Sequence, residues 1–597
     1  MKKSKLFIKV LSYGLTVLIA LSMTACGGSS GGNITVSFMY GGDVAIVELY
    51  NSLIEEFNKT EGKKEKIKIK GIPKTSSIDS VLSQQLPGNN GPDVVSISDK
   101  EFKKFSSYFD DMTGKIDQKT LDDFYSNTIS RYHYNTSTTT SNSDDPLYGV
   151  PGYNDTTVLY YNKTALEKAG VICISVEQKD LDAFNKGSFK DANGKSKSDY
   201  GITVNVPAKG FYRSMTPFVS KPDETNGSSW QLPADDEILI FNDKIALNWD
   251  EIEDIGLICT QDRNPDSATK YGYYTEWWFN YGWSVGGDCL EDMSGKGDWT
   301  YSLASDLPNY IVADGKTYTG IYSGTNYKSG ETLSMIDVVD AKVGDTISYE
   351  TDNSTYFYYT INGSKAEHRN FDAEISNGTL VELPSIKEAF SRFCYLAGNG
   401  GINVCPYPDA FTGSNSVYYF TSGSLAFLTE KISCASSIKK MMKDDWGVAL
   451  LPIYKTYTEP TNPNCDTIAK QGKVAAHSLG YSVCVNSKTK VKDAAYKFIN
   501  WIATEGQKFM AKSGEISSRK SDRDLFLENC KYDNAAIILD SAENAKAGDW
   551  WYMPDTNWIT VWANTLNGKV RYGKMDFETF LYSCIAETNK RLQEYKK

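Results

Sequence analysis

Apolar and polar residues alternate in two short segments near the start of the chain, and a third short segment is mostly apolar. Ile34, Val36 and Phe38 alternate in the first segment, residues 67–72 repeat the pattern, and the third segment reads "PDVVSIS". A period of two predicts a strand, because successive side chains of a strand point to opposite faces. We therefore expect three strands in this part of the chain.

Helical repeats separate these strands. Ile46, Tyr50, Leu53 and Phe57 recur at the spacing of one helix face, and a shorter helix is predicted around residues 81–86. Strands alternating with helices predict an α/β fold, in which a parallel sheet carries helices on both faces. Ligands of such sheets bind beyond the carboxyl ends of the strands. This rule directs attention to the positions just after the first and third strands, which include Asp43 and Asp99.

Residues 1–32 have the pattern of an export signal followed by a tether. Four lysines precede an apolar run at residues 10–21, which is too short to span a bilayer and is typical of a signal peptide. The segment that ends at Cys26 resembles the lipobox of bacterial lipoproteins, with Met23 where that motif usually has Leu. The resemblance implies removal of residues 1–25, a lipid on Cys26 and a flexible tether over residues 26–32. The alternative is a plain secretory signal with an incidental cysteine.

Composition narrows the class of protein. Of the 597 residues, 40% are hydrophobic and 23% are charged, as in a folded soluble chain. Acidic residues outnumber basic ones by 75 to 63, so nucleic acid is not expected as a partner. Three histidines leave little scope for His-based catalysis or metal binding. The 39 tyrosines and 12 tryptophans supply many rings for stacking.

No catalytic motif has the context that its chemistry requires. The G-x-S-x-G match at residues 27–31 lies in the tether, whereas a nucleophile elbow needs a strand before it and a helix after it. Two G-K-[ST] tripeptides lack the first glycine of a Walker A motif, because Phe189 and Tyr310 occupy that position. The cysteines after Cys26 form no C-x-x-C pair, and whether they form disulfides stays open. We expect no catalytic residue, metal or cofactor, although a carboxylate pair set by the fold would escape a motif search.

Later segments keep the motif order of one protein family. In chain order they read "YGVPGYNDTTVLYYNKTALEKAGV", "LNWDEIEDIGLICT", "TKYGYYTEWWFNYGWSVGGD", "YYFTSGSLAFL", "WGVALLPI" and "DAAYKFINWIATEGQKFMAKSGEISSR". With the strands before them, these segments resemble the family 1 extracellular solute-binding proteins, the sugar-binding receptors of bacterial ABC importers. One departure is the missing proline after the last motif, where Ser517 or Ser518 stands.

The resemblance implies a periplasmic-binding-protein-like fold of type II, with two discontinuous lobes joined by hinge crossings. Carried onto this chain, lobe one holds residues 33–155 and 479–515, and lobe two holds residues 156–478 and 516–597. Two stretches that the family normally lacks, residues 172–246 and 291–382, become insertions on lobe two. The second stretch is rich in Tyr, Thr, Gly and Ser and alternates in places, so strands and hairpins are expected there.

Aromatic and polar residues near the strand ends and hinges are the candidates for binding a sugar. Rings bury the C–H faces of a sugar at a low entropic cost, and carboxylates and amides bond its hydroxyls. Two tryptophan-rich clusters, the first hinge and the ends of two strands supply these groups. The candidate ligand residues are Asp43, Asp99, Tyr153, Asn154, Asp155, Trp277, Trp278, Tyr281, Trp283, Trp551 and Trp558.

Each candidate also has an ordinary structural interpretation. The rings of "TEWWFNYGW" point in several directions around a helix, so at least two of them are expected in the core. Tyr153 and its neighbours fit turn chemistry, and Asp43 and Asp99 fit helix caps. At the second hinge, His477 is expected to be a buried structural residue rather than a ligand.

The sequence thus predicts a lipid-anchored extracytoplasmic receptor for a carbohydrate, interpreted as an oligosaccharide, which closes on its ligand and delivers it to ABC permease subunits. We expect a monomer that touches the membrane only through its lipid and catalyses no reaction. Three alternatives stay open: a peptide-binding receptor, an exported enzyme acting on glycans, and an adhesin that uses the second insertion.

Overall fold

The computed structural model describes residues 33–42, 44–74, 78–137, 141–216, 230–275, 278–292, 299–301, 303–342, 344–352, 356–397, 401–405, 415–530, 532, 534–547 and 563–594. The predicted signal and tether with Cys26 lie outside these residues, as do Asp43, Trp277, Trp551 and Trp558. Within the described ranges, no helix is long and apolar enough to cross a membrane.

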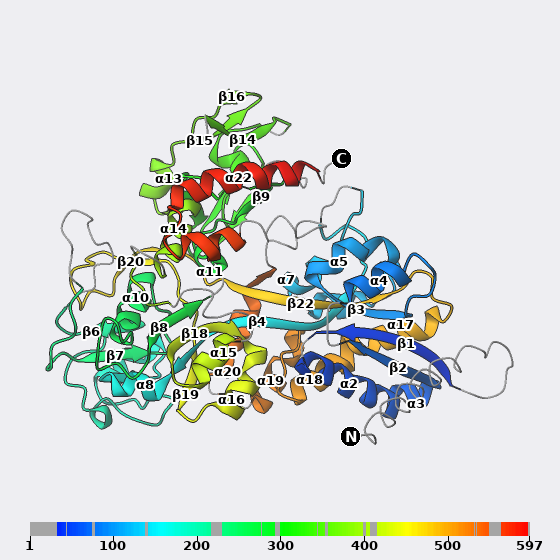
Figure 1. Ribbon diagram of the computed structural model, residues 1–597, viewed down its shortest axis with the longest axis horizontal. Coiled ribbons are helices and arrows are strands. Elements are labelled where there is room, and N and C mark those ends of the chain that lie inside the picture. Colours follow the sequence, from blue (N-terminus) through cyan, green and yellow to red (C-terminus); the bar gives the residue numbers. More distant parts are fainter. Residues whose placement is uncertain are drawn as a thin grey trace, which may run out of the picture.

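A nine-stranded mixed sheet runs through the middle of the molecule (Figure 1). Its path is β2 (Ile67–Lys74), β1 (Ile34–Gly41), β3 (Val94–Ser98), β22 (Ala476–Val485), β4 (Val150–Asn162), β18 (Leu425–Lys431) and β8 (Tyr271–Thr275). Off this path, β19 (Trp446–Ala449) pairs with β4, and β23 (Ala545–Ala547) pairs with β22. Strands from distant parts of the chain therefore share one sheet, with β4 and β22 at its centre.

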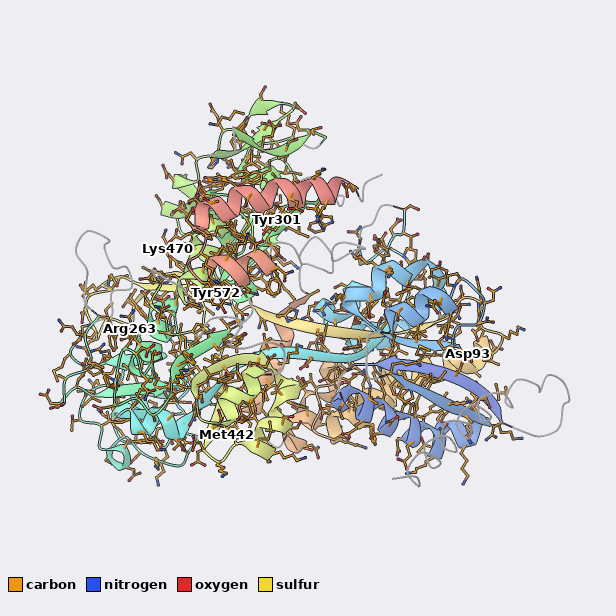
Figure 2. The ribbon with its side chains drawn as sticks, in the orientation of Figure 1. Asp93, Arg263, Tyr301, Met442, Lys470 and Tyr572 are labelled. Carbon is orange, nitrogen blue, oxygen red and sulfur yellow. The ribbon has the colours of Figure 1, made fainter. Side chains whose placement is uncertain are left out.

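The N-terminal part has the α/β order that the hydrophobic pattern predicts. β1 pairs in parallel with both β2 and β3, and the predicted strands and helices are present. The helices of this part are α2 (Val44–Lys59), α3 (Glu61–Glu65), α4 (Asp79–Gln85), α5 (Asp99–Phe105), α6 (Gln118–Asp123) and α7 (Ser126–Ile129). Two helices from later in the chain, α17 (Lys492–Trp501) and α18 (Gln507–Lys512), contribute to the same core. Asp93, labelled in Figure 2, accepts hydrogen bonds from the Ser37 backbone N–H at 2.8 Å and the Thr489 hydroxyl at 2.6 Å. This carboxylate ties β1 to the segment that leads into α17.

Two hydrophobic cores meet at the middle of the sheet. The first core gathers residues between Val36 and Tyr153, residues between Val483 and Met510, and Ala547. The second core gathers residues between Val158 and Leu592. Residues 154–157 of β4 belong to neither core and carry buried polar side chains. This polar stretch therefore separates two units that each pack around their own apolar interior.

A small separate sheet lies within residues 171–242. β5 (Val171–Ile174) pairs in parallel with β7 (Leu239–Asn242), which pairs antiparallel with β6 (Phe211–Arg213). Residues of these strands and of the segments between them form a third, minor core around Phe184 and Ile240. The sheet is fastened to α10 (Trp249–Ile258) by Arg213, whose Nη1 lies 3.0 Å from Asp254 Oδ1.

The described residues between Leu290 and Leu383 form short strands and hairpins, as predicted from the sequence, together with the two short helices α12 (Met335–Val338) and α13 (Asp372–Ser376). The strands are β9 (Leu290–Asp292), β10 (Trp299–Tyr301), β11 (Asn309–Val312), β12 (Thr317–Thr319), β13 (Asn326–Lys328), β14 (Ile347–Asp352), β15 (Tyr356–Ile361), β16 (Ser364–Lys365) and β17 (Leu380–Leu383). In Figure 1 this green region stands beside α22 (Phe577–Glu594), above the end of the central sheet.

The cysteines after Cys26 are free thiols, which answers the question of disulfides for the described chain. Ten free cysteines lie between Cys173 and Cys584. Burial raises the pKa of Cys259, Cys394 and Cys484 to about 12. These three thiols stay protonated at neutral pH and serve as small apolar residues of the cores.

Lys103 of α5 is a buried cation whose removal is expected to stabilise the protein. Its ammonium lies 5.0 Å from the centre of the Tyr134 ring, and burial lowers the pKa of Lys103 from 10.5 to about 7. Between these values the unfolded chain binds more protons than the folded one, so stability rises with pH, and below them the cost is fully present. Lys103→Met is expected to raise the free energy of unfolding by about 2–3 kcal/mol at pH 6.5 and by much less at pH 9.5.

Urea unfolding at both pH values, followed by tryptophan fluorescence, measures this difference. Lys100→Met removes an exposed lysine from the same helix and is expected to change stability by less than about 0.5 kcal/mol. An effect of Lys103→Met that is the same at both pH values would contradict the burial argument.

Candidate ligand-binding site

The register of β4 against β22 fixes which side chains share a face where the two cores meet. Residues directly opposite in an antiparallel pair project to the same face, and successive residues alternate. Asn154 lies opposite Gly480, Asp155 opposite Leu479, and Thr156 opposite Ser478. We call residues 153–157 and 477–481 the strand crossing. Its first face carries Tyr153, Asp155, Thr157, His477, Leu479 and Tyr481, and its second face carries Asn154, Thr156 and Ser478.

The three predicted ligand residues at the first hinge are therefore divided between two faces. Tyr153 and Asp155 project to one side of the strand, and Asn154 projects to the other. All three are buried. A ligand on one side of the strand crossing would meet Tyr153 and Asp155, or Asn154, but not the side chains of all three.

On the first face, the strand crossing contacts parts of both cores. Asp155 Oδ1 accepts a hydrogen bond from the Ser433 backbone N–H at 3.1 Å, just before α16 (Ala435–Met441). Tyr153 lines a pocket of about 50 Å³, with Ala45 and Leu49 of α2 on one side and Ile432 on the other. This volume holds a few water molecules and is too small for a saccharide ring. The closed space between the two cores is thus narrow on this side.

On the second face, Asp99 is the centre of a buried hydrogen-bond network. Its carboxylate accepts hydrogen bonds from Arg131 Nη1 at 2.7 Å, from the Tyr132 hydroxyl at 3.0 Å and from the Gly480 backbone N–H at 3.0 Å. Gly480 is required here, because a Cβ at this position would lie 2.6 Å from Asp99 Oδ2. Asp99 therefore links β3, the segment after α7, and β22.

Arg131 extends this network to β4. Its Nη1 also donates to the Ser478 hydroxyl at 3.0 Å, and that hydroxyl donates to Asn154 Oδ1 at 2.5 Å. The predicted ligand residues Asp99 and Asn154 are thus brought together around the buried Arg131 side chain. Because both use their acceptors on protein donors, their first role in this structure is to hold the strand crossing in register.

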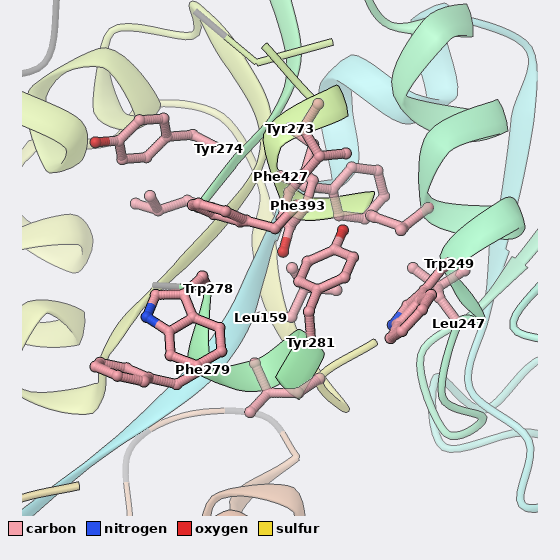
Figure 3. Packing of buried hydrophobic residues seen from close by; sticks show 14 of the residues in the cluster. Leu159, Leu247, Trp249, Tyr273, Tyr274, Trp278, Phe279, Tyr281, Phe393 and Phe427 are labelled. Carbon is pink, nitrogen blue, oxygen red and sulfur yellow. The ribbon is translucent and has the colours of Figure 1, made fainter. Parts of the chain in front are cut away.

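The described rings of the first tryptophan cluster are buried in the second core. They lie in or next to α11 (Phe279–Ser284), and Trp278, Tyr281 and Trp283 are 3%, 2% and 0% exposed. Figure 3 shows Trp278, Phe279 and Tyr281 packed among other aromatic and aliphatic side chains of this core. The expectation that at least two of these rings are core residues is confirmed. Stacking on a sugar would require one of them to become exposed.

His477 joins this aromatic cluster to the first face of the strand crossing. The Phe279 and Trp283 rings stack at 4.9 Å between centroids, and the imidazole lies 5.6 Å from Phe279. Burial, with the charges of Lys431 and Arg131, moves the pKa of His477 well below 6.5, so the ring is neutral at neutral pH. The burial that the sequence predicts for His477 is thus confirmed, and its structural role stays a prediction.

Two larger hollows lie beside the small sheet of residues 171–242, and the predicted ligand residues do not line them. One, of about 160 Å³, is bordered by Arg213, Asp250 and Tyr457. The other is an open groove of about 1140 Å³ bordered by Asn185 and Asn464, among others. Both involve the small sheet of residues 171–242 or its surroundings rather than the strand crossing.

Sequence reasoning missed several polar residues at the strand crossing. Arg131 and Ser478 are separated by 347 positions, and Asp155 and Ser433 by 278. No motif contains any of these pairs, because the fold alone brings them together. The sequence did offer one signal for Ser478. It lies between His477 and Gly480 at the predicted second hinge, where side chains are expected to contact both cores.

Comparisons with known proteins agree with this architecture. Residues 43–215 match the family model of the bacterial extracellular solute-binding protein, which confirms the resemblance seen in the motifs. No curated protein matches the chain. Residues 43–215 are thus similar to this family, and the chain has a mixed α/β fold of the type II periplasmic-binding-protein kind.

Solved structures of sugar-binding proteins share the fold at low sequence identity. The sugar-binding protein MalE of Xanthomonas citri is 15% identical, with a TM-score of 0.53, and the match covers 94% of this chain and 98% of that one. An ABC substrate-binding protein of Listeria monocytogenes in complex with cycloalternan is 13% identical, with a TM-score of 0.52 and coverage of 94% and 99%. Maltose-bound MalE3 of T. maritima is 15% identical, with a TM-score of 0.51 and the same coverage.

Proposed function

We propose that this protein is an extracytoplasmic receptor that binds a carbohydrate and delivers it to the permease of an ABC importer. The observation that carries the proposal is the pair of hydrophobic cores joined through β4 and β22, with a polar stretch where they meet. Strands that link separately packed units are suited to hinge motion, because little apolar surface must be broken when the units rotate. Closure on a ligand needs no bond chemistry.

The lobes that take part are those inferred from the family resemblance. Residues 33–155 and 479–515 form lobe one in this proposal, and residues 156–478 and 516–597 form lobe two with its two insertions. The distribution of the two cores supports this division, since the first core draws on both segments of lobe one. The hinges lie at the strand crossing.

A carbohydrate is the ligand class best supported. Two solved structures with this fold hold cycloalternan or maltose, and this chain has the rings and the carboxylates that such ligands use. Asp43, Trp277, Trp551 and Trp558 remain candidates for contact, together with Tyr153 and Asp155 on the first face. A lipid on Cys26 would keep the receptor at the outer face of the cell membrane, and the tether of residues 26–32 would let it reach the permease.

Small-angle scattering tests hinge closure. The radius of gyration of the purified chain from residue 33 onward is expected to fall when a saturating saccharide is added, because the two lobes approach each other. The protein without saccharide is the control for this measurement. A radius that stays the same with a saccharide bound would contradict the hinge mechanism.

A further inference from the structure

Two lysines flank the beginning of β22 on the first face of the strand crossing. Lys546 lies opposite His477 in the parallel pair of β23 and β22, so both side chains project to the same face. The Lys546 ammonium lies 5.8 Å from the centre of the Trp283 ring. Lys473 comes three residues before β22, and its backbone N–H donates to the Ser284 carbonyl at the end of α11.

The Lys473 ammonium is held by neutral oxygens. It donates to the Thr332 hydroxyl at 3.1 Å and lies 3.5 Å from the Gly330 carbonyl. Both acceptors belong to the stretch of residues 291–382, so this predicted insertion reaches the edge of the strand crossing. Among the described residues, neither Lys473 nor Lys546 forms an ion pair with a carboxylate.

In the described part of the chain, the nearby acids form no ion pair with either lysine. Asp288 uses one oxygen for the Trp283 indole N–H and the other for the Cys289 backbone N–H, both at 2.8 Å. Glu331 raises the pKa of Lys473, but by less than the charge of Lys546 lowers it. Burial, followed by the charge of Lys546, lowers the pKa of Lys473 to about 7, so protonation of Lys473 beside Lys546 carries a free-energy cost.

We propose that Lys473 and Lys546 form a subsite for an anionic group, and that the ligand of this receptor is therefore an acidic saccharide carrying a carboxylate or a sulfate. The inference rests on the proposed function, since it specifies the class of carbohydrate bound. An anion between the two ammonium groups would relieve their repulsion and form charge-assisted hydrogen bonds with both. The protein as a whole carries a net charge of −12, so its overall field does not attract anions and the selection depends on these two side chains.

Titration calorimetry with matched saccharides tests the subsite. The probes are an oligogalacturonate, the same oligosaccharide after reduction of its carboxyl groups, and a sulfated oligosaccharide of similar length. The acidic probe that fits the site is expected to bind at least about tenfold more tightly than the neutral one, and its advantage should shrink as salt is added. Binding of the galacturonate alone identifies a carboxylate, and binding of the sulfated probe alone identifies a sulfate.

The double variant K473Q/K546Q separates the subsite from the rest of the binding site. It is expected to bind acidic and neutral probes equally, with a melting temperature no lower than that of the unchanged protein, because the charge removed was buried at a cost. The control K488Q/K490Q removes the same charge from an exposed segment and is expected to keep the preference. Equal binding of acidic and neutral probes by the unchanged protein, or a preference retained by K473Q/K546Q, would overturn the subsite while leaving a carbohydrate receptor in place. Binding of peptides and of no saccharide would overturn the proposed function as well.

Discussion

Replacing Asp99 by alanine is expected to lower the free energy of unfolding by about 3–5 kcal/mol, because the change leaves the charge of Arg131 buried without its carboxylate. The two side chains are 1% and 5% exposed, so water does not replace the lost partner. Tyr132 and the Gly480 backbone N–H lose their acceptor at the same time. Unfolding in guanidinium chloride, followed by circular dichroism, measures the loss.

A matched control distinguishes this buried pair from an ordinary surface pair. Asp79→Ala removes a carboxylate 2.5 Å from the Lys104 ammonium, where the side chains are 36% and 45% exposed. The expected loss is under about 1 kcal/mol, because water screens and solvates both groups. Asp99→Asn keeps the shape and one acceptor, so its cost should fall between the two. Similar losses for Asp79→Ala and Asp99→Ala would contradict the role given to the network at the strand crossing.

Replacing Arg213 by methionine is expected to cost about 4–5 kcal/mol, since it leaves two carboxylates buried near each other. Arg213 Nη2 lies 3.1 Å from Glu237 Oε2, Nη1 lies 3.0 Å from Asp254 Oδ1, and the three side chains are between 0% and 3% exposed. The pair with Asp254 holds the small sheet of residues 171–242 against α10. Limited proteolysis within that stretch, together with chemical unfolding, measures the effect.

Two further variants serve as references for the loss of stability expected from Arg213→Met. Arg591→Met breaks a pair with Glu587 one helical turn away, at 2.9 Å and with side chains 34% and 51% exposed, and should cost no more than about 0.5 kcal/mol. Arg213→Lys keeps the charge but loses the planar fork that bonds both carboxylates, so it should fall in between. If Arg213→Met were as mild as Arg591→Met, the sheet would not depend on this ion pair.

The early strands and helices were within reach of the sequence because their pattern is local. Val36 and Phe38 alternate with polar residues, and Tyr50, Leu53 and Phe57 share a helix face, so each element carries its own signal. The many aromatic residues in and next to α11 likewise predicted that some of them are buried in a core. Such elements form wherever the pattern of burial matches the period of the backbone.

The strand crossing needed information that no local pattern holds. Asn154 and Asp155 are neighbours in sequence, yet the pleat of β4 sends them to opposite faces. Arg131 was not singled out, because its importance comes from Asp99 and from Ser478, which is 347 positions away. Lys546 is brought to the Trp283 ring, at the start of β22, by the pairing of β22 with β23.

Titration calorimetry with a panel of saccharides and peptides tests the central claim most directly, because it measures binding without assuming a transporter partner. The protein is expected to bind at least one oligosaccharide at a stoichiometry of one to one, to release no products from it, and to give no heat with the peptides. Binding to peptides with no response to any saccharide would contradict the account.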